Sequence, residues 1–191
     1  GLYQIVQTTR TNNGFFGIGG GTRTTNSEVT TGIDGGLSQE FSRVLASLRD
    51  GVLTAAGQLG IDGASAVLDA FQVNLGRISF EGMSSSEISA TLNAVFSAVG
   101  DDMAAAILPG LSAFQRAGEG MLETLSRLAT EFRTVDVTLA SIGMVFGTVG
   151  LASLEARTRL VELSGGLDAF VEGADFFAQN FLTDAQRIAP I

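Results

Sequence analysis

Residues 84–99 read SSSEISATLNAVFSAV, and this stretch predicts the start of an amphipathic helix. The Ser84 hydroxyl can cap a free N–H of the first turn, and Glu87, three residues later, completes a capping box. The apolar residues that follow share one helix face: Ile88, Leu92, Val95, Phe96 and Val99. We expect the helix to end or bend at Gly100 and Asp101.

The same period of 3.6 residues appears on both sides of this helix. Before it, an apolar stripe begins at about Leu37 and ends where glycines appear, between Gly57 and Gly60. After it, the residues from Leu122 to Val135 carry a second long stripe. Further helices are predicted over Ala64–Ala70, over Asp102–Leu108 before Pro109-Gly110, over Val137–Leu163 and over Leu167–Ile188, with Ser164-Gly165-Gly166 between the last two.

Two parts of the chain have the alternating pattern of β-strands instead. The segments from Tyr3 to Thr11 and from Thr22 to Thr31 flank a glycine-rich stretch, which predicts a hairpin with a long tip. Phe71 to Phe80 predicts one further strand, with a bulge or bend inside it. We therefore expect an α+β fold that is mainly α, with an N-terminal β-hairpin in residues 1–35 and amphipathic helices, plus the strand near 71–80, in residues 36–191.

The amino-acid composition excludes several classes of catalytic site. The 191 residues include no Cys, His, Lys or Trp. Without Cys and His the chain has no thiolate nucleophile, no Ser-His-Asp triad and no typical zinc site. Without Lys it has no P-loop. We therefore expect no enzymatic activity, no catalytic residues, no metal and no cofactor.

Charge is scattered along the chain and not gathered in blocks. Eleven arginines stand against 20 acidic residues, which gives a net charge of −9. A nucleic-acid-binding surface needs a basic patch, and none is visible. The sequence therefore argues against specific nucleic-acid binding, and its charge agrees with an ordinary solvated surface.

Five further stretches of the chain form a recognisable pattern, although none of them is a catalytic or metal-binding motif. They are Asn74-Leu75-Gly76-Arg77-Ile78-Ser79-Phe80-Glu81-Gly82-Met83-Ser84, Pro109-Gly110-Leu111, Gly118-Glu119-Gly120, Leu163-Ser164-Gly165-Gly166-Leu167 and Asn180-Phe181. With the capped helix they resemble the C-terminal region of tail tape measure proteins of long-tailed bacteriophages and prophages, over roughly Ile33 to Arg187. Members of that family often carry Lys where this chain has Arg, which alters the surface chemistry but not the pattern.

The resemblance implies a structural role in a phage tail. It implies that several copies, three as the family suggests, lie in the tail tube as a homo-oligomer and set the tail length. Their C-terminal ends would lie at the tail tip, among the distal tail and hub proteins. Release towards the host at DNA ejection is also implied, so the expected location is the virion, in the tail lumen and tip, and then the host cell envelope, with transient membrane contact. Because the chain opens with Gly1, we read it as a fragment or a processed product.

The predicted hairpin tip is the first candidate contact site. Its apolar side chains stand among glycines: Phe15, Phe16 and Ile18. Exposed apolar residues at a loop tip typically mark an interaction, here with a neighbouring tail protein. The alternative for this segment is a flexible tip without a contact.

The second candidate is the uncharged stretch from Val137 to Leu154, where Gly143, Gly147 and Gly150 repeat at small-residue spacing. Such spacing lets two helices approach closely. Eighteen uncharged residues are also just enough to span a bilayer. The Ser and Thr residues make the stretch only moderately apolar, so helix packing is the favoured interpretation and membrane insertion is the alternative.

Two carboxylate pairs are the remaining candidates for acid–base chemistry, Asp101 with Asp102 and Glu119 with Glu123. Adjacent residues on a helix point about 100° apart, and a Glu pair four residues apart typically lies on a solvated face. Asp102 fits a helix cap better. Two alternatives to the structural role stay open: a membrane-active segment that inserts into the host envelope to form a DNA channel, and a cell-wall glycan hydrolase, a module that some tape measure proteins carry.

Overall fold

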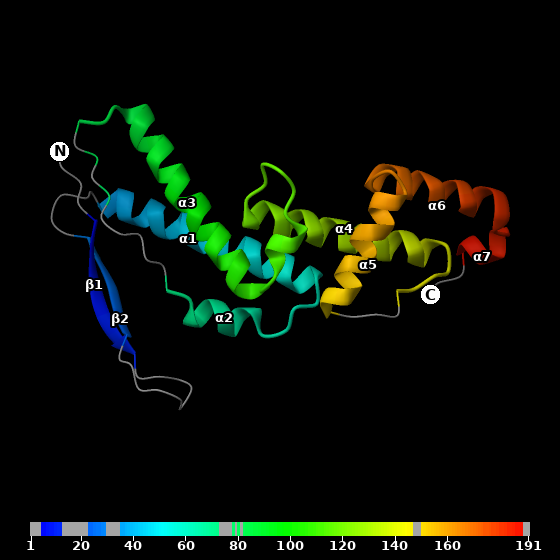
Figure 1. Cartoon of the computed structure of the whole chain (residues 1–191), viewed down its shortest axis with the longest axis horizontal. Helices are drawn as coiled ribbons and strands as arrows, with labels where there is room; N and C mark the ends of the chain where they lie inside the picture. The colour runs from blue at the N-terminus through cyan, green and yellow to red at the C-terminus, as the bar shows by residue number, and fades with distance from the viewer. Residues whose placement is uncertain are drawn as a thin grey trace.

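The computed structural model describes residues 5–12, 23–29, 35–72, 78, 80, 82–146 and 150–188, with side chains from Phe41 to Arg187. Its elements are β1 (Ile5–Asn12), β2 (Arg23–Val29), α1 (Gly35–Gln58), α2 (Ala64–Ala70), α3 (Ser85–Ile107), the 3-10 helix η1 (Leu111–Phe114), α4 (Met121–Ser141), α5 (Gly150–Leu163), α6 (Leu167–Phe181) and α7 (Asp184–Ile188). Figure 1 shows a long, narrow body, with α1 and α3 at one end and α6 and α7 at the other.

The α+β fold class expected from the sequence is wrong. Among the residues whose side chains the structure describes, 77% are helical and none lies in a strand. The predicted N-terminal hairpin is not part of this helical fold. For β1 and β2 only an antiparallel backbone pair is described, with no third strand beside it. An isolated two-stranded ribbon is marginally stable in water, so the core of this chain is built by helices.

The further strand predicted near 71–80 is also wrong. The described residues of this segment, Phe71, Gln72, Ile78 and Phe80, have no strand conformation. Ile78 and Phe80 are instead buried against α3, where Ile88, Leu92 and Val95 pack around them. The alternating apolar residues that predict a strand thus pack on a helix instead.

The start of α3 follows the sequence prediction. The Ser84 N–H donates to Glu87 Oε2 at 2.7 Å, and the Glu87 N–H donates to Ser84 Oγ at 3.4 Å, so the capping box is confirmed. A helix end at Gly100 and a separate helix over Asp102–Leu108 are both wrong, because α3 continues to Ile107. Gly100 instead gives room to a neighbour, since a Cβ there would lie 2.7 Å from Leu122 Cδ2 of α4.

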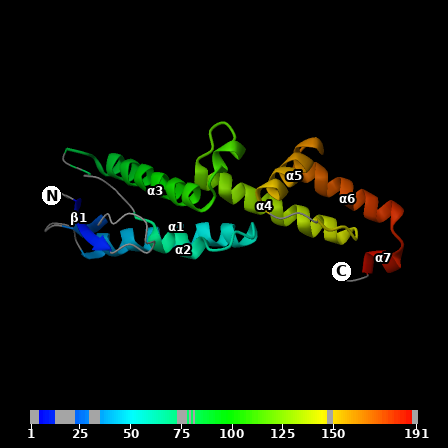
Figure 2. The ribbon, with the colours of Figure 1, turned by 60° about the horizontal axis from the view of Figure 1, so that its bottom comes forward.

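Two hydrophobic cores lie along α4. The larger one joins α1, α3 and the first half of α4, and its fully buried side chains include Val52, Leu125 and Leu128. The smaller one joins the second half of α4 to α5 and α6 through Val135, Leu139 and Val161. Both Figure 1 and Figure 2 show α6 beside the last part of α4 and continuing past its end.

The single helix predicted over Val137–Leu163 is wrong, because α4 ends at Ser141 and α5 begins at Gly150. Gly143 has a φ of 75°. Its N–H donates to the Ala140 carbonyl at 3.0 Å, and the Met144 N–H donates to the Leu139 carbonyl at 2.8 Å. This is the Schellman arrangement, which a glycine with positive φ closes most easily. The uncharged stretch therefore contains a helix end.

Candidate functional site

The structure describes only part of the two contact sites predicted from the sequence. Phe15, Phe16 and Ile18 lie outside the described residues, as does Gly147. Gly150 is the first residue of α5. Gly143 lies in the turn after α4, where a Cβ would find no heavy atom of the described chain within 4 Å. No close helix contact is therefore made at Gly143 within this part of the chain, and a contact with another chain stays a prediction.

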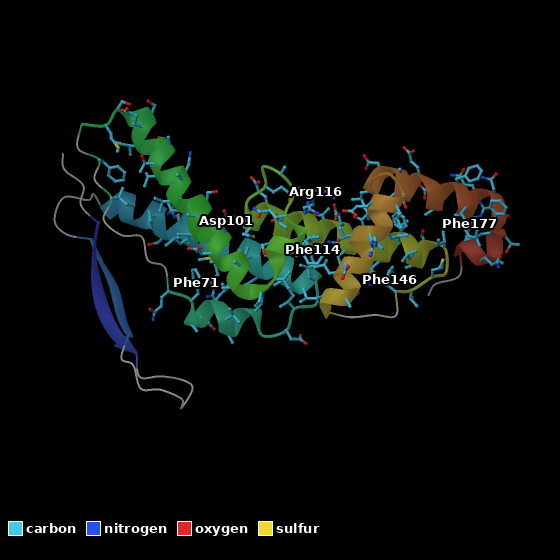
Figure 3. The ribbon with its side chains drawn as sticks, in the orientation of Figure 1. Phe71, Asp101, Phe114, Arg116, Phe146 and Phe177 are labelled. Atoms are coloured by element: carbon cyan, nitrogen blue, oxygen red, sulfur yellow. The ribbon has the colours of Figure 1, made fainter. Side chains whose placement is uncertain are left out.

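One carboxylate of each predicted pair, Asp101 and Glu123, lies at the start of α4. Asp101, labelled in Figure 3, accepts the Leu122 N–H at 2.8 Å and so caps α4 from the neighbouring helix α3. Glu123 accepts the Gly120 N–H at 3.1 Å at the same helix end. Free N–H groups and the helix dipole both favour negative charge there. Asp102, expected to be a cap, is an exposed residue inside α3 instead.

Glu119 lies in a network of ion pairs between the loop before α4 and α4 itself. The Arg127 guanidinium donates to both Glu119 oxygens, with Nε–Oε1 at 2.7 Å and Nη2–Oε2 at 3.0 Å. Arg127 also contacts Glu131 at 3.3 Å, and Arg116 contacts Glu131 at 3.0 Å. The hydrogen bond from Arg127 lowers the pKa of Glu119 to about 2. Glu119 is therefore a permanent carboxylate near neutral pH and no general acid.

A groove of about 480 Å³ opens beside this network, near Arg116 and Phe114, which Figure 3 labels. Arg127 contributes from α4, and Glu155, Arg159 and Glu162 contribute from α5. Both signs of charge line it, so it favours neither an anion nor a cation. Within the described residues, no group of three or more His, Cys, Asp or Glu side chains is placed to hold a metal ion.

Arg157 of α5 is the most deeply buried charged group of the described chain, with 4% of the residue exposed. Its guanidinium lies between two aromatic rings, 3.9 Å from the Phe132 centroid and 4.3 Å from the Phe146 centroid. It donates to Asp136 Oδ1 from Nε at 2.9 Å and from Nη2 at 2.7 Å, and it also donates to Ser153 Oγ. These contacts fasten α5 and the segment after α4 to α4. Sequence reasoning missed this centre, although Phe132 and Asp136 stand one helical turn apart.

Three phenylalanines on α6 form an exposed cluster, which we call the α6 aromatic patch: Phe176, Phe177 and Phe181. Their residues are 63%, 41% and 67% exposed, respectively. The Phe177 and Phe181 rings stack with centroids 5.4 Å apart, and the Phe176 ring meets that of Phe181 at 6.4 Å. Figure 3 places Phe177 at the far end of the molecule. Contiguous apolar surface of this kind typically marks an interaction site.

Exposed apolar residues also follow α4 at this end of the molecule, since Met144 is 55% exposed and Val145 is 75% exposed. Among the helices that the structure describes, none is both long and apolar enough to cross a bilayer.

Comparison with known proteins returns no match, whether against protein-family models, curated proteins or solved structures.

Proposed function

We propose that the chain is a structural and assembly component of a phage tail, namely the distal, C-terminal part of a tape measure protein. In this role it is held at the tail tip and takes part in tail length determination and genome ejection. The observation that carries the proposal is the α6 aromatic patch, exposed at one end of a narrow helical body. Such a surface needs a neighbour, and an assembly supplies neighbours.

The use of charged groups in the chain supports a structural role. Glu119, Arg127 and Glu131 tie a loop to α4, while Asp136 and Arg157 tie α5 to it. Asp101 caps α4. These carboxylates and guanidinium groups therefore have structural partners.

An antibody raised against the purified chain tests the proposal on virions from the strain that encodes it. Immunogold labelling in the electron microscope should mark the tip of the tail distal to the capsid. Opening of the tip with a mild chaotrope serves as a control for antigen hidden in the tail lumen. Label on the capsid, or intact tails that lack the chain by mass spectrometry, would rule the proposal out.

The second expected consequence concerns assembly. Deletion of the coding segment for residues 35–188 should give tails of abnormal length or no tails. A membrane-active segment predicts a different defect, with tails of normal length that fail to deliver DNA. Dye release from lipid vesicles and digestion of purified peptidoglycan test the membrane-active and hydrolase alternatives directly on the purified chain.

A further inference from the structure

The apolar face of α6 follows a heptad pattern, with successive intervals of three, four, three and four residues. Its members are Leu167, Phe170, Ala174, Phe177 and Phe181. This interval pattern is that of the a and d positions of a coiled coil, where one helix packs lengthwise on another. We call this row of residues the α6 seam.

Within the residues that the structure describes, only the first half of the α6 seam has a partner. Leu167 and Phe170 pack on the core between α4 and α5, and Ala174 is 7% exposed. Phe177 and Phe181 continue the same face, yet they are 41% and 67% exposed. The views in Figures 1 and 2 agree on the reason, because α6 continues beyond the end of α4. The seam therefore extends an existing helix–helix contact into open space.

The charges of α6 determine which occupant fits the open half. The residues that flank the seam at the e and g positions are uncharged: Val171, Gly173, Ala178 and Asn180. The acidic residues Asp168, Glu172 and Asp175 lie at the b and f positions, away from it. Two identical helices can thus meet along the seam without like charges facing each other. An anionic lipid surface would find no basic residue on α6 to attract it.

We propose that a second copy of this chain occupies the open half of the seam, so that Phe177 and Phe181 of one copy pack against the same residues of the other. The contact is isologous, because each copy contributes the same surface. It adds a specific self-association surface to the proposed tail role and does not depend on that role, since the seam is a property of α6 alone.

The size of the contact predicts its strength. A phenylalanine buries about 150–250 Å². The exposed fractions of Phe177 and Phe181, the two residues of the open half of the seam, then correspond to roughly 200 Å² for each chain, or about 400 Å² for a pair. Stable interfaces bury about 1,200 Å² or more. We therefore expect reversible association, with a Kd on the order of 100 µM, and not a permanent dimer.

Sedimentation velocity of the purified chain, from about 10 µM to about 1 mM, measures this association by mass action. The Phe177→Gln, Phe181→Gln double variant should raise the Kd about tenfold or more, because both seam residues lose their apolar surface. The matched control is Leu163→Gln at the end of α5, where Leu163 is 82% exposed and lies off the seam. This control should associate like the parent chain.

A spin label tests the same contact without removing a phenylalanine. The chain has no cysteine, so Asn180→Cys beside the seam and Ser112→Cys on η1 each carry a single label. At high concentration a short label-to-label distance is expected for Asn180→Cys and not for Ser112→Cys. Circular dichroism at 222 nm identifies any variant that has lost its helices, and the label-to-label distance then decides whether the two seams are in contact.

Three results would overturn the inference. They are a chain that remains monomeric at 1 mM, a folded double variant that associates like the parent, and a Leu163→Gln control that loses association as fully as the double variant. Vesicle binding without self-association would identify a lipid surface instead. The self-association test uses purified protein and the tail test uses virions, so each proposal can fail while the other holds.

Discussion

Arg157 offers the sharpest test of how this helical body is held together, because its guanidinium ties α5 to Asp136 of α4. Its side chain is 5% exposed, and it lies between the Phe132 and Phe146 rings with two hydrogen bonds to Asp136. Arg157→Ala removes all of these contacts and leaves a cavity. We expect helices α5 and α6 to loosen from α4 before the larger core unfolds.

The expected cost follows from two effects. A desolvated cation over an aromatic face contributes about 2 kcal/mol, and breaking a buried ion pair costs about 3–5 kcal/mol when the other charge stays buried. Here the Asp136 side chain is 41% exposed, so water can solvate it after the change. Desolvation of the guanidinium also offsets part of the gain from the rings. We therefore expect Arg157→Ala to lower the free energy of unfolding by about 3 kcal/mol, at the low end of the buried-pair range.

Urea unfolding followed by circular dichroism at 222 nm measures this loss. Arg157→Lys keeps the charge but not the flat guanidinium between the rings, and it should cost about 1–2 kcal/mol. The control is Arg159→Ala, an exposed arginine on the same helix, which should stay within about 0.5 kcal/mol of the parent. A loss below about 1 kcal/mol for Arg157→Ala, or equal losses for both arginines, would refute the reasoning.

Further substitutions test the other local contacts. Because the folded-state pKa of Glu119 lies at about 2, below the ordinary 4.5, its contribution to stability is present above pH 4.5 and is lost as the pH falls towards 2. Glu119→Gln should therefore flatten the pH dependence of the urea midpoint in that window. Gly51→Ala should raise stability by about 0.5–1 kcal/mol, since Gly51 lies inside α1 with nothing within 4 Å of an added Cβ. Gly120→Ala should instead lower stability by about 1 kcal/mol, because the Cβ would lie 2.7 Å from Asp101 Oδ1 and displace this cap. Calorimetry compares the Gly51 and Gly120 variants with the parent chain. Ser84→Ala should cost about 1 kcal/mol and speed amide exchange in the first turn of α3.

Features of the fold that depend on neighbouring residues can be predicted from the sequence. The short helix predicted over Ala64–Ala70 has the observed bounds, and the spacing of Ser84 and Glu87 is enough to predict the capping box. A second capping box, which stands at the start of α7, is not predicted from the sequence. There the Thr183 N–H donates to Gln186 Oε1 at 2.9 Å. The three-residue spacing is present there too, within the helix predicted over Leu167–Ile188.

Features that depend on distant residues could not be predicted. Gly100 followed by Asp101 has the local pattern of a helix end. In the structure both residues instead serve α4, because Gly100 leaves room for the Leu122 side chain and Asp101 accepts the Leu122 N–H. Ile78 and Phe80 alternate as in a strand, but α3 covers them. Apolar spacing alone does not distinguish these partners.

The α6 aromatic patch, the candidate contact surface, could not be predicted for the same reason. The sequence pattern favours the glycines from Gly143 onward, whereas the exposed apolar cluster lies on α6. Periodicity predicts which face of α6 is apolar, but not that α4 ends at Ser141 and leaves Phe177 and Phe181 uncovered. Likewise, an arginine in an amphipathic helix is expected at the surface, and the buried position of Arg157 follows only from the rings that α4 and the next segment bring to it.

Two charged residues and one apolar cluster of the described chain depart from the placement that is usual in a self-sufficient monomer. Arg157 and Glu131 are buried, while the α6 aromatic patch is exposed. Burying Phe177 and Phe181 between two copies removes about 400 Å² from water and gains about 10 kcal/mol at ~25 cal/mol per Å². Association costs about 4–15 kcal/mol in lost freedom, so this contact alone gives at best weak association of free chains. It becomes favourable where other contacts already hold the copies together, because the effective concentration then rises to the order of millimolar. The patch is therefore suited to a chain that works inside an assembly.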